Sequence, residues 1–383
     1  MIYNETLSEY TLEELLFQAQ DEEFPFSMEK KHCARYKELK EKFANYPVEM
    51  GAMSSAFETW IKETQERVAE ISKTENEQER SEQLADLFVE DPIIFLNRHD
   101  ITHTLKVQEK AKDILGCFNE LNITYYELYF LLCASVVHDI GNIFGRKGHE
   151  RNIKAILDSE CTDILPDSIE RRVIARIARA HGGSISGNSD TISHLKESET
   201  INNQNIRERL LAAVLRFADE LADDSTRANH AALKSDIITE ASKIYHVYST
   251  ALHTVEIRKN DINQSFEVVL AYEFDSKIAA ILFGKAGQKK YLIDEIYERT
   301  LKMERERRYC IRYLRPYCPL ERIKVQITIT NANDEFLSYR ITYTLEESGY
   351  PSTPFATIKD VDRHIKTGTE LLNELRKEGM LNE

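Results

Sequence analysis

The stretch SVVHDIGNIFGRKGHERN, residues 135–152, decides the fold of this 383-residue chain. An apolar helical pattern runs up to Val137 and ends in His138 and Asp139, which are followed by Gly141 and a basic loop. A buried ionised aspartate is costly unless it is paired or bound to a metal. The motif therefore predicts that a buried helix presents two metal-binding side chains at its C-terminal end.

Other segments place polar side chains where an apolar core is expected. His181 continues the apolar stripe of the helical pattern RRVIARIARAH, and Asp219 lies in LLAAVLRFADEL, which is apolar nearly all round. His103 begins a face that later apolar residues continue, and His149 follows the glycine-rich loop. These side chains are candidates for partners of the first motif.

Three of these motifs also have a structural explanation. His138 and Asp139 could face solvent at a helix end, His103 could be a partly exposed first-turn histidine, and His149 could be a solvated loop residue. For any one of them alone, the structural explanation is the better prediction. It would, however, require five coincidences in one chain, and we therefore favour a metal site.

Composition limits the classes of function. With 50 basic and 65 acidic residues the formal charge is −15, which disfavours binding to nucleic acid polymers or to anionic membranes. The six cysteines form no C-x-x-C pair, so we expect reduced thiols. The sequence has neither a signal-peptide pattern nor an apolar run long enough to span a bilayer, and we expect a cytoplasmic protein.

The pattern predicts a mainly α chain of three regions. Residues 1–90 form an N-terminal helical extension, and residues 91–235 form the helical domain that carries the histidines, interrupted after His181 by a long polar loop. Residues 244–383 form a smaller α+β region of order ββαββα. Its expected elements are strands within 243–259 and 265–275, a helix over about 276–313, strands on both sides of residues 331–333, and a helix over 358–378.

The ordered motifs THTLKV, VVHDIGN and RFADELAD resemble the HD superfamily of metal-dependent phosphohydrolases, over about residues 95–235. The resemblance implies a helical HD-domain bundle. RFADELADDSTRA followed by YHVYSTALHTVEI is similar to the HD-CE type, which occurs in bacteria beside or fused to Hsp90-like ATPases. An Hsp90-like ATPase is therefore an implied partner, and a homodimer is the default expectation for a soluble protein.

The resemblance implies a ligand set. The first metal would be held by His103, His138, Asp139 and Asp219, and Asp139 would bridge to a second metal held by His149 and His181. Gly182 stands where many two-metal members have a further histidine, so one or two metals remain open. Imidazole and carboxylate ligands suit Mn²⁺, Fe²⁺, Co²⁺ or Ni²⁺, and Mg²⁺ remains an alternative.

The activity that the resemblance implies is hydrolysis of a phosphoester or phosphoanhydride bond of a nucleotide, such as a (deoxy)nucleoside triphosphate or a cyclic nucleotide. Asp139, His149 and Glu150 are the candidate catalytic residues; with a single metal, His149 or Glu150 would serve as general acid or base. Arg146, Lys147 and Arg151 are candidates for binding phosphate, or belong to a solvated basic loop. The alternatives are a di-iron HD oxygenase and a non-catalytic or regulatory module that partners another protein.

Overall fold

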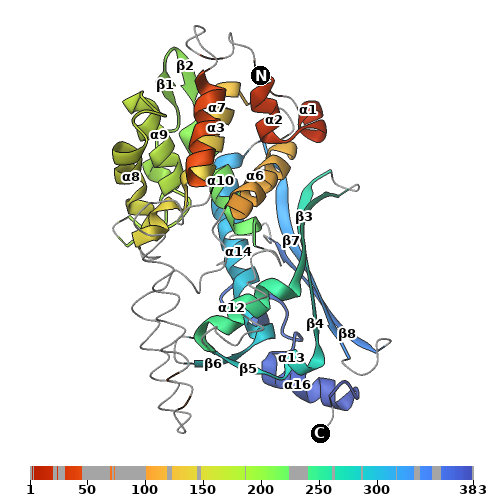
Figure 1. Cartoon of the computed structure of the whole chain (residues 1–383). Helices are drawn as coiled ribbons and strands as arrows, with labels where there is room; N and C mark the ends of the chain where they lie inside the picture. Colours follow the sequence, from red (N-terminus) through yellow and green to blue (C-terminus); the bar gives the residue numbers. More distant parts are fainter. Residues whose placement is uncertain are drawn as a thin grey trace. The chain divides into compact units, whose positions relative to one another are not determined.

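The computed structural model describes residues 2, 4–19, 24, 31–44, 70, 73, 101–118, 123–144, 148–185, 187–223, 240–260, 264–285, 288–315, 317–331, 337–346 and 355–381. Contacts divide the chain into two compact units, Met1–Asp219 and Glu220–Glu383. Figure 1 shows the elements of both units, coloured along the sequence.

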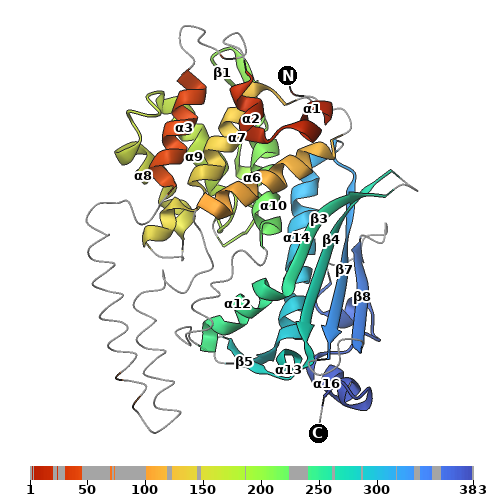
Figure 2. The ribbon, with the colours of Figure 1, turned by 45° about the vertical axis from the view of Figure 1, so that its right-hand side comes forward.

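The helix that precedes the HD motif lies at the centre of the first unit. This helix, α7 (Tyr125–Val137), is buried at every position from Tyr126 to Val137 because its sequence is apolar on all sides. Helices of the same unit surround it (Figure 2). They are α1 (Asn4–Glu9), α2 (Leu12–Phe17), α3 (Lys31–Phe43), α6 (Ile101–Gly116), α8 (Ile153–Glu160), α9 (Ser168–Arg179) and α10 (Glu208–Leu221).

The N-terminal helices join this core through buried polar groups. Glu170 of α9 is 1 % exposed and contacts three donors: the Tyr126 hydroxyl at 2.6 Å, His32 Nε2 at 3.1 Å and the Arg35 guanidinium at 3.4 Å. His32 and Arg35 belong to α3. A buried carboxylate with several partners fixes α3 against α7 and α9, because each partner left alone would be a buried unpaired group.

One carboxylate sets the starting point of two helices. Thr124 and Glu127 form a capping box at the start of α7. Glu127 also accepts hydrogen bonds from the backbone and guanidinium of Arg207, which directly precedes α10. The two helices contain 13 and 14 residues and thus have nearly equal lengths. Their C-terminal ends therefore reach the same level of the unit.

The segment between His181 and α10, predicted as a long polar loop, contains regular structure. It includes the 3-10 turn η5 (Ile192–His194) and an antiparallel hairpin of β1 (Glu199–Ile201) and β2 (Gln204–Ile206). Asn202 and Asn203 form its turn with φ angles of 50° and 63°. Two central residues with positive φ are typical of tight hairpin turns, and this signal was present in the Asn-Asn pair.

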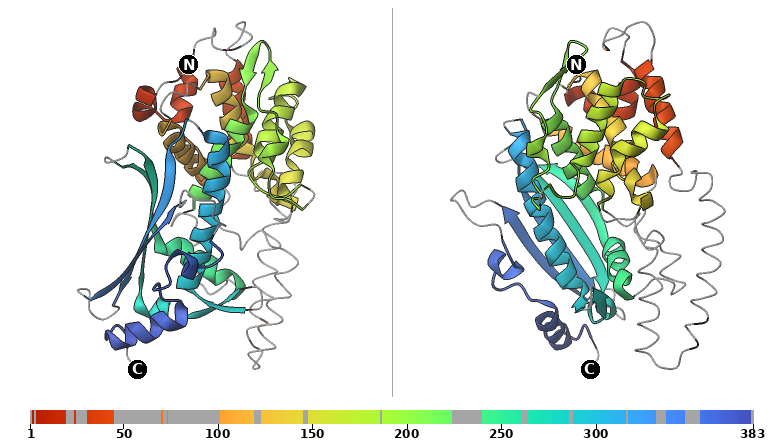
Figure 3. Two further views of the ribbon diagram at one scale, coloured as in Figure 1. Left: turned by 180° about the vertical axis from the view of Figure 1, so that it is seen from behind. Right: turned by 90° about the vertical axis from the view of Figure 1, so that its left-hand side faces the viewer.

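The second unit contains a four-stranded sheet of order β3-β4-β7-β8. β3 pairs antiparallel with β4, β4 pairs parallel with β7, and β7 pairs antiparallel with β8. The parallel pair requires a crossover, whose long helix α14 lies along one face of the sheet (Figure 3). The elements are β3 (Leu252–Lys259), β4 (Phe266–Asp275), α14 (Leu292–Leu314), β7 (Leu320–Thr330), β8 (Ser338–Glu346), α15 (Ile358–Val361) and α16 (Gly368–Lys377).

Two predicted elements of this region were wrong. Residues Glu240–Ala251 form a helix, α12, and not the start of a strand, because Ile244, Tyr248 and Ala251 bury one helical face despite their β-forming neighbours. The expected helix over 276–313 begins only at Leu292. It is preceded by α13 (Ser276–Ala279) and a hairpin of β5 (Leu282–Lys285) and β6 (Gln288–Tyr291), which the turn sequence GKAG signals.

The prediction of a mainly α chain with a smaller α+β region is confirmed. The boundaries of the three predicted regions stay predictions, since residues 74–100 and 224–239 lie outside the described part of the chain. None of the six cysteines forms a disulfide bond, and five of them are buried. Among the described helices, none combines the length and apolarity that a bilayer span requires.

The cluster around Glu170 makes a stability prediction. We expect Glu170→Ala to lower the free energy of unfolding by about 3–5 kcal/mol, because it leaves buried His32 and Tyr126 without their acceptor. Glu160→Ala is the control: it removes a half-exposed pair with Lys42 and should cost about 0–1 kcal/mol. Urea unfolding measures both, and equal losses would contradict a structural role for the cluster.

Candidate metal centre

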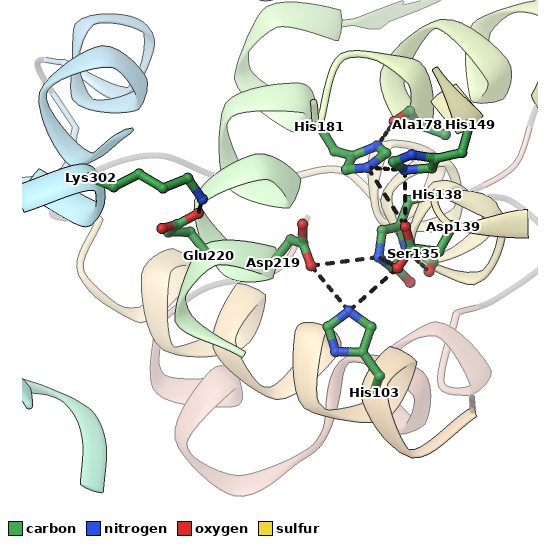
Figure 4. A network of polar contacts seen from close by, with 10 residues as sticks. All are labelled: His103, Ser135, His138, Asp139, His149, Ala178, His181, Asp219, Glu220 and Lys302. Carbon is green, nitrogen blue, oxygen red and sulfur yellow. Dashed lines mark hydrogen bonds and ion pairs between the residues drawn. The ribbon is translucent and has the colours of Figure 1, made fainter. Parts of the chain in front are cut away.

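Six side chains predicted as metal ligands converge at one end of the helices of the first unit (Figure 4). Each comes from a helix end or from a short turn. His103 lies in the first turn of α6, His138 is the C-cap of α7 and Asp139 follows it, His149 begins the turn η4 (His149–Arg151), His181 follows the C-cap of α9, and Asp219 lies in the last turn of α10.

Three helices direct their C-terminal ends toward these side chains. The unsatisfied carbonyl groups at a helix C-terminus carry partial negative charge and stabilise a nearby cation. Here α7, α9 and α10 end beside Asp139, His181 and Asp219, respectively. The backbone therefore adds to the negative potential that the two carboxylates create.

The first group of ligands surrounds one oxygen of each carboxylate. His103 Nε2 lies 3.1 Å from Asp219 Oδ1 and 3.8 Å from Asp139 Oδ2. His138 Nε2 lies 3.3 Å from Asp139 Oδ2 and 3.6 Å from Asp219 Oδ1. The ligand atoms of His103, His138 and Asp139 lie within 4.8 Å of one another, and Asp219 Oδ1 approaches both imidazoles, an arrangement that could hold a divalent metal.

The second group uses the other oxygen of the same aspartate. His149 Nε2 lies 3.1 Å from Asp139 Oδ1, and His181 Nε2 lies 3.8 Å from it. The ligand atoms of Asp139, His149 and His181 all lie within 4.8 Å of one another. Asp139 therefore belongs to both groups and could bridge two cations.

Backbone carbonyls determine which nitrogen of two histidines carries the proton. His138 Nδ1 donates to Ser135 O at 2.7 Å, and His181 Nδ1 donates to Ala178 O at 2.6 Å. A carbonyl oxygen can only accept, so each Nδ1 must be protonated. In the neutral ring, Nε2 then keeps its lone pair, and in both residues this atom faces the centre. This is the form in which histidine binds metals.

A buried atom without a hydrogen bond tests whether a metal fits. His138 Nε2 is fully buried and makes no hydrogen bond of acceptable geometry with the described residues. His149 Nε2 and His181 Nε2 approach to 3.1 Å, although the His181 atom has no proton to donate when that ring is neutral. A cation between these nitrogens and the carboxylates would satisfy them, and the donor set suits a divalent transition metal.

The protonation equilibria of the candidate ligands differ from one residue to the next. Burial opposes protonation of His138, but the carboxylates of Asp139 and Asp219 outweigh burial and raise its pKa well above the usual range. Burial lowers the pKa of His181 to about 4. Burial acts against ionisation of Asp219, yet contacts with His103 and His138 hold its pKa well below the usual value. Near neutral pH, Asp219 is ionised and His181 is neutral, as metal ligation requires, whereas a bound metal would have to displace the second proton of His138.

Glu150, a predicted acid or base, is buried beside the second group. Its side chain is 6 % exposed and lies 3.7 Å from His149 Nδ1 and 3.5 Å from Arg151 Nε. Gly183 passes so close that a Cβ atom there would lie 2.4 Å from Glu150 Oε1, and its φ is +72°. Sequence analysis missed Gly183, although the Gly-Gly pair after His181 was a signal of close backbone approach.

The predicted phosphate-binding residues have different outcomes. Arg151 is described, and 63 % of its side chain is exposed. Arg146 and Lys147 lie outside the described residues. Arg216 of α10 is buried and donates to Thr191 Oγ1, Ser189 O and Ala180 O. It therefore ties the segment after His181 to the helix of Asp219.

The contact between Gly183 and Glu150 leads to a stability prediction. We expect Gly183→Ala to lower the free energy of unfolding by about 1–3 kcal/mol, because the new methyl group collides with Glu150 at a positive φ. Gly182→Ala is the matched control, since nothing lies within 4 Å of its Cβ position, and it should change stability by about 0.5 kcal/mol or less. Urea unfolding compares the two variants, and equal effects would contradict the close approach.

Comparison with known proteins gives one match. The family model described as HD-CE matches residues 82–302, which is more than half of the chain and includes all six converging side chains. No curated protein and no solved structure matches the chain. Since the match covers most of the described first unit from α6 onward, the resemblance seen in the motifs is confirmed. The chain belongs to the HD-CE family.

Proposed function

We propose that this protein is a metal-dependent phosphohydrolase that acts on a phosphoester or phosphoanhydride bond of a nucleotide. The observation that carries the proposal is the division of the Asp139 carboxylate between two pairs of imidazoles, one pair facing each oxygen. Such a paired ligand set suits the in-line attack of water on phosphorus, in which the bond between phosphorus and the leaving oxygen breaks. The membership of the chain in the HD-CE family supports the same chemistry.

The metal ligands would be divided between two ions. His103, His138, Asp139 and Asp219 would hold the first, and Asp139 would share the second with His149 and His181. When bound, a divalent ion lowers the pKa of a water molecule toward neutrality and polarises a phosphoryl oxygen. Mn²⁺, Fe²⁺, Co²⁺ and Ni²⁺ suit these ligands, and we expect the second position to be weaker because Gly182 offers no further imidazole.

Side chains next to the ligands would handle protons and phosphate. His149 Nδ1 faces Glu150 Oε2 at 3.7 Å, so the carboxylate can orient the imidazole and stabilise its protonated form. Glu150 itself, or His149 when only one metal is bound, would transfer a proton to the leaving oxygen. Arg151 is exposed beside this pair, and we propose that its guanidinium contacts phosphate oxygens.

One prediction of the proposed function concerns the number of bound metal ions. We expect the chain to bind two Mn²⁺ ions at saturation, Asp139→Ala to bind none because both groups lose their shared ligand, and His149→Ala to retain one. Equilibrium dialysis followed by elemental analysis counts the ions. Retention of full stoichiometry by Asp139→Ala would contradict the assignment.

Two adjacent acidic residues provide a matched control. Asp219 faces His103 and His138, whereas Glu220 forms an ion pair with Lys302 (Figure 4). Asp219→Ala should therefore lose the first metal, and Glu220→Ala should bind metal as the unaltered chain does. Equal losses in the two variants would show that general negative charge, and not ligation, attracts the ions.

A further prediction of the proposed function concerns nucleotide hydrolysis. We expect hydrolysis within a panel of nucleoside triphosphates, nucleoside monophosphates and cyclic nucleotides with Mn²⁺ present, abolished by a chelator and restored by added metal. The double variant His138→Ala with Asp139→Ala should lose activity at least about 100-fold while remaining folded by circular dichroism. Phosphate or nucleoside release measured by chromatography gives the rate.

The same panel separates the alternatives. Bound metal without any hydrolysis would contradict the proposed function and would favour a regulatory module. Iron bound by anaerobically purified protein, with oxygen consumption but no phosphate release, would instead favour an oxygenase. A chain that binds no metal would contradict both enzymatic functions.

A further inference from the structure

A buried chain of hydrogen bonds leads from the N-terminal helix α3 to the ligand His138. Its members are Tyr36 of α3, Gln108 of α6 and Ser135 of α7, which are 0 %, 6 % and 1 % exposed. Gln108 Nε2 lies 3.2 Å from the Tyr36 hydroxyl and 2.8 Å from Ser135 Oγ. Three helices thus meet at one amide group.

The direction of these bonds follows from their donors. Ser135 Oγ donates its hydrogen to Leu132 O at 2.7 Å, so toward Gln108 it can only accept. The amide nitrogen of Gln108 must therefore face Ser135, and its two N–H groups serve Ser135 Oγ and the Tyr36 hydroxyl. The Tyr36 hydroxyl in turn lies 3.4 Å from Gln108 Oε1 and donates its hydrogen toward it. No other uncharged side chain of similar length supplies two donors from one atom.

Ser135 connects this chain to the metal centre. Its hydroxyl accepts from Gln108, while its backbone carbonyl accepts from His138 Nδ1 at 2.7 Å. Figure 4 shows Ser135 beside His138. The carbonyl of Ser135 fixes the ring orientation of His138. The hydroxyl of Ser135 attaches the helical turn that contains this carbonyl to Gln108 of α6. Since α6 also carries His103, one hydrogen bond sets the spacing of two candidate ligands.

We propose that Gln108 is a positioning residue of the metal centre, and that through Tyr36 it makes the N-terminal helix α3 part of the support of His138. The inference rests on the proposed metal centre and gives the N-terminal region a role in it. Outer partners that orient a ligating histidine change metal affinity without touching the metal. If these hydrogen bonds served folding alone, removing them would change the stability of the protein and leave the metal affinity of the folded protein unaltered.

The test uses three variants of the full chain and one control. Gln108→Met removes both donors and the acceptor of the amide at similar length, Ser135→Ala removes the hydroxyl beside His138, and Tyr36→Phe removes only the distant hydroxyl. Tyr129→Phe is the control, because Tyr129 is also fully buried, lies on α7 and has no part in this chain of bonds. Co²⁺ affinity and the visible spectrum of the Co²⁺ protein are measured for each, together with urea unfolding.

We expect Ser135→Ala and Gln108→Met to weaken Co²⁺ binding about tenfold and to alter its visible absorption bands, because the imidazole of His138 loses its fixed orientation. Tyr36→Phe should weaken binding by a smaller factor, and Tyr129→Phe should leave affinity and spectrum unchanged. This order follows the distance of each change from His138.

Two results would overturn the inference, and they differ in what else they affect. In the first, the unaltered protein binds Co²⁺, and the variants lose stability but keep the Co²⁺ affinity and spectrum of the unaltered protein. The series of hydrogen bonds is then structural only, and the proposed function stands. If the unaltered chain binds no metal, both fail together. Should Gln108→Met not fold, Tyr36→Phe with the affinity and spectrum of Tyr129→Phe would overturn the inference by itself.

Discussion

The carboxylate of Asp139 is the constraint on which the centre depends. One oxygen faces His103 and His138, and the other faces His149 and His181. With only 14 % of its side chain exposed, this carboxylate is stabilised by positive charge, because partial burial removes part of its hydration. The raised pKa of His138 shows that the surrounding groups already favour one positive charge there. A bound cation would replace this proton and satisfy the lone pairs that face the centre.

The helices that build the first unit place these groups by their lengths and ends. Glu127 caps α7 and holds Arg207 at the start of α10, so that two helices of similar length end together. Their C-terminal carbonyls, with those of α9, add a negative potential at the same point. Carbonyls of the last turn also accept from His138 and His181, which leaves the other ring nitrogen of each free for a ligand. The ends of these helices thus supply a negative potential at the site and hold the histidine rings in the orientation that metal binding requires.

Buried polar groups around the site explain why the N-terminal helices belong to the same unit. Glu170 joins α3 to α7 and α9, and Gln108 joins α3 to α6 and α7. Such groups specify one arrangement of helices, since any slip leaves donors or acceptors unpaired in the interior. In the proposed phosphohydrolase this rigidity would hold the ligands in place.

The sequence by itself determined the helical class, the α+β character of the second unit and the six converging side chains, because a polar residue on an apolar helical face must be paired inside the core. It misassigned residues 243–251 as strand and 282–291 as helix, since short apolar runs have similar local preferences in both states. Only the tertiary structure decided which oxygen of Asp139 meets which histidine, that Gly183 packs on Glu150, and that Gln108 joins three helices. These contacts depend on distances between segments far apart in the chain, which local periodicity does not contain.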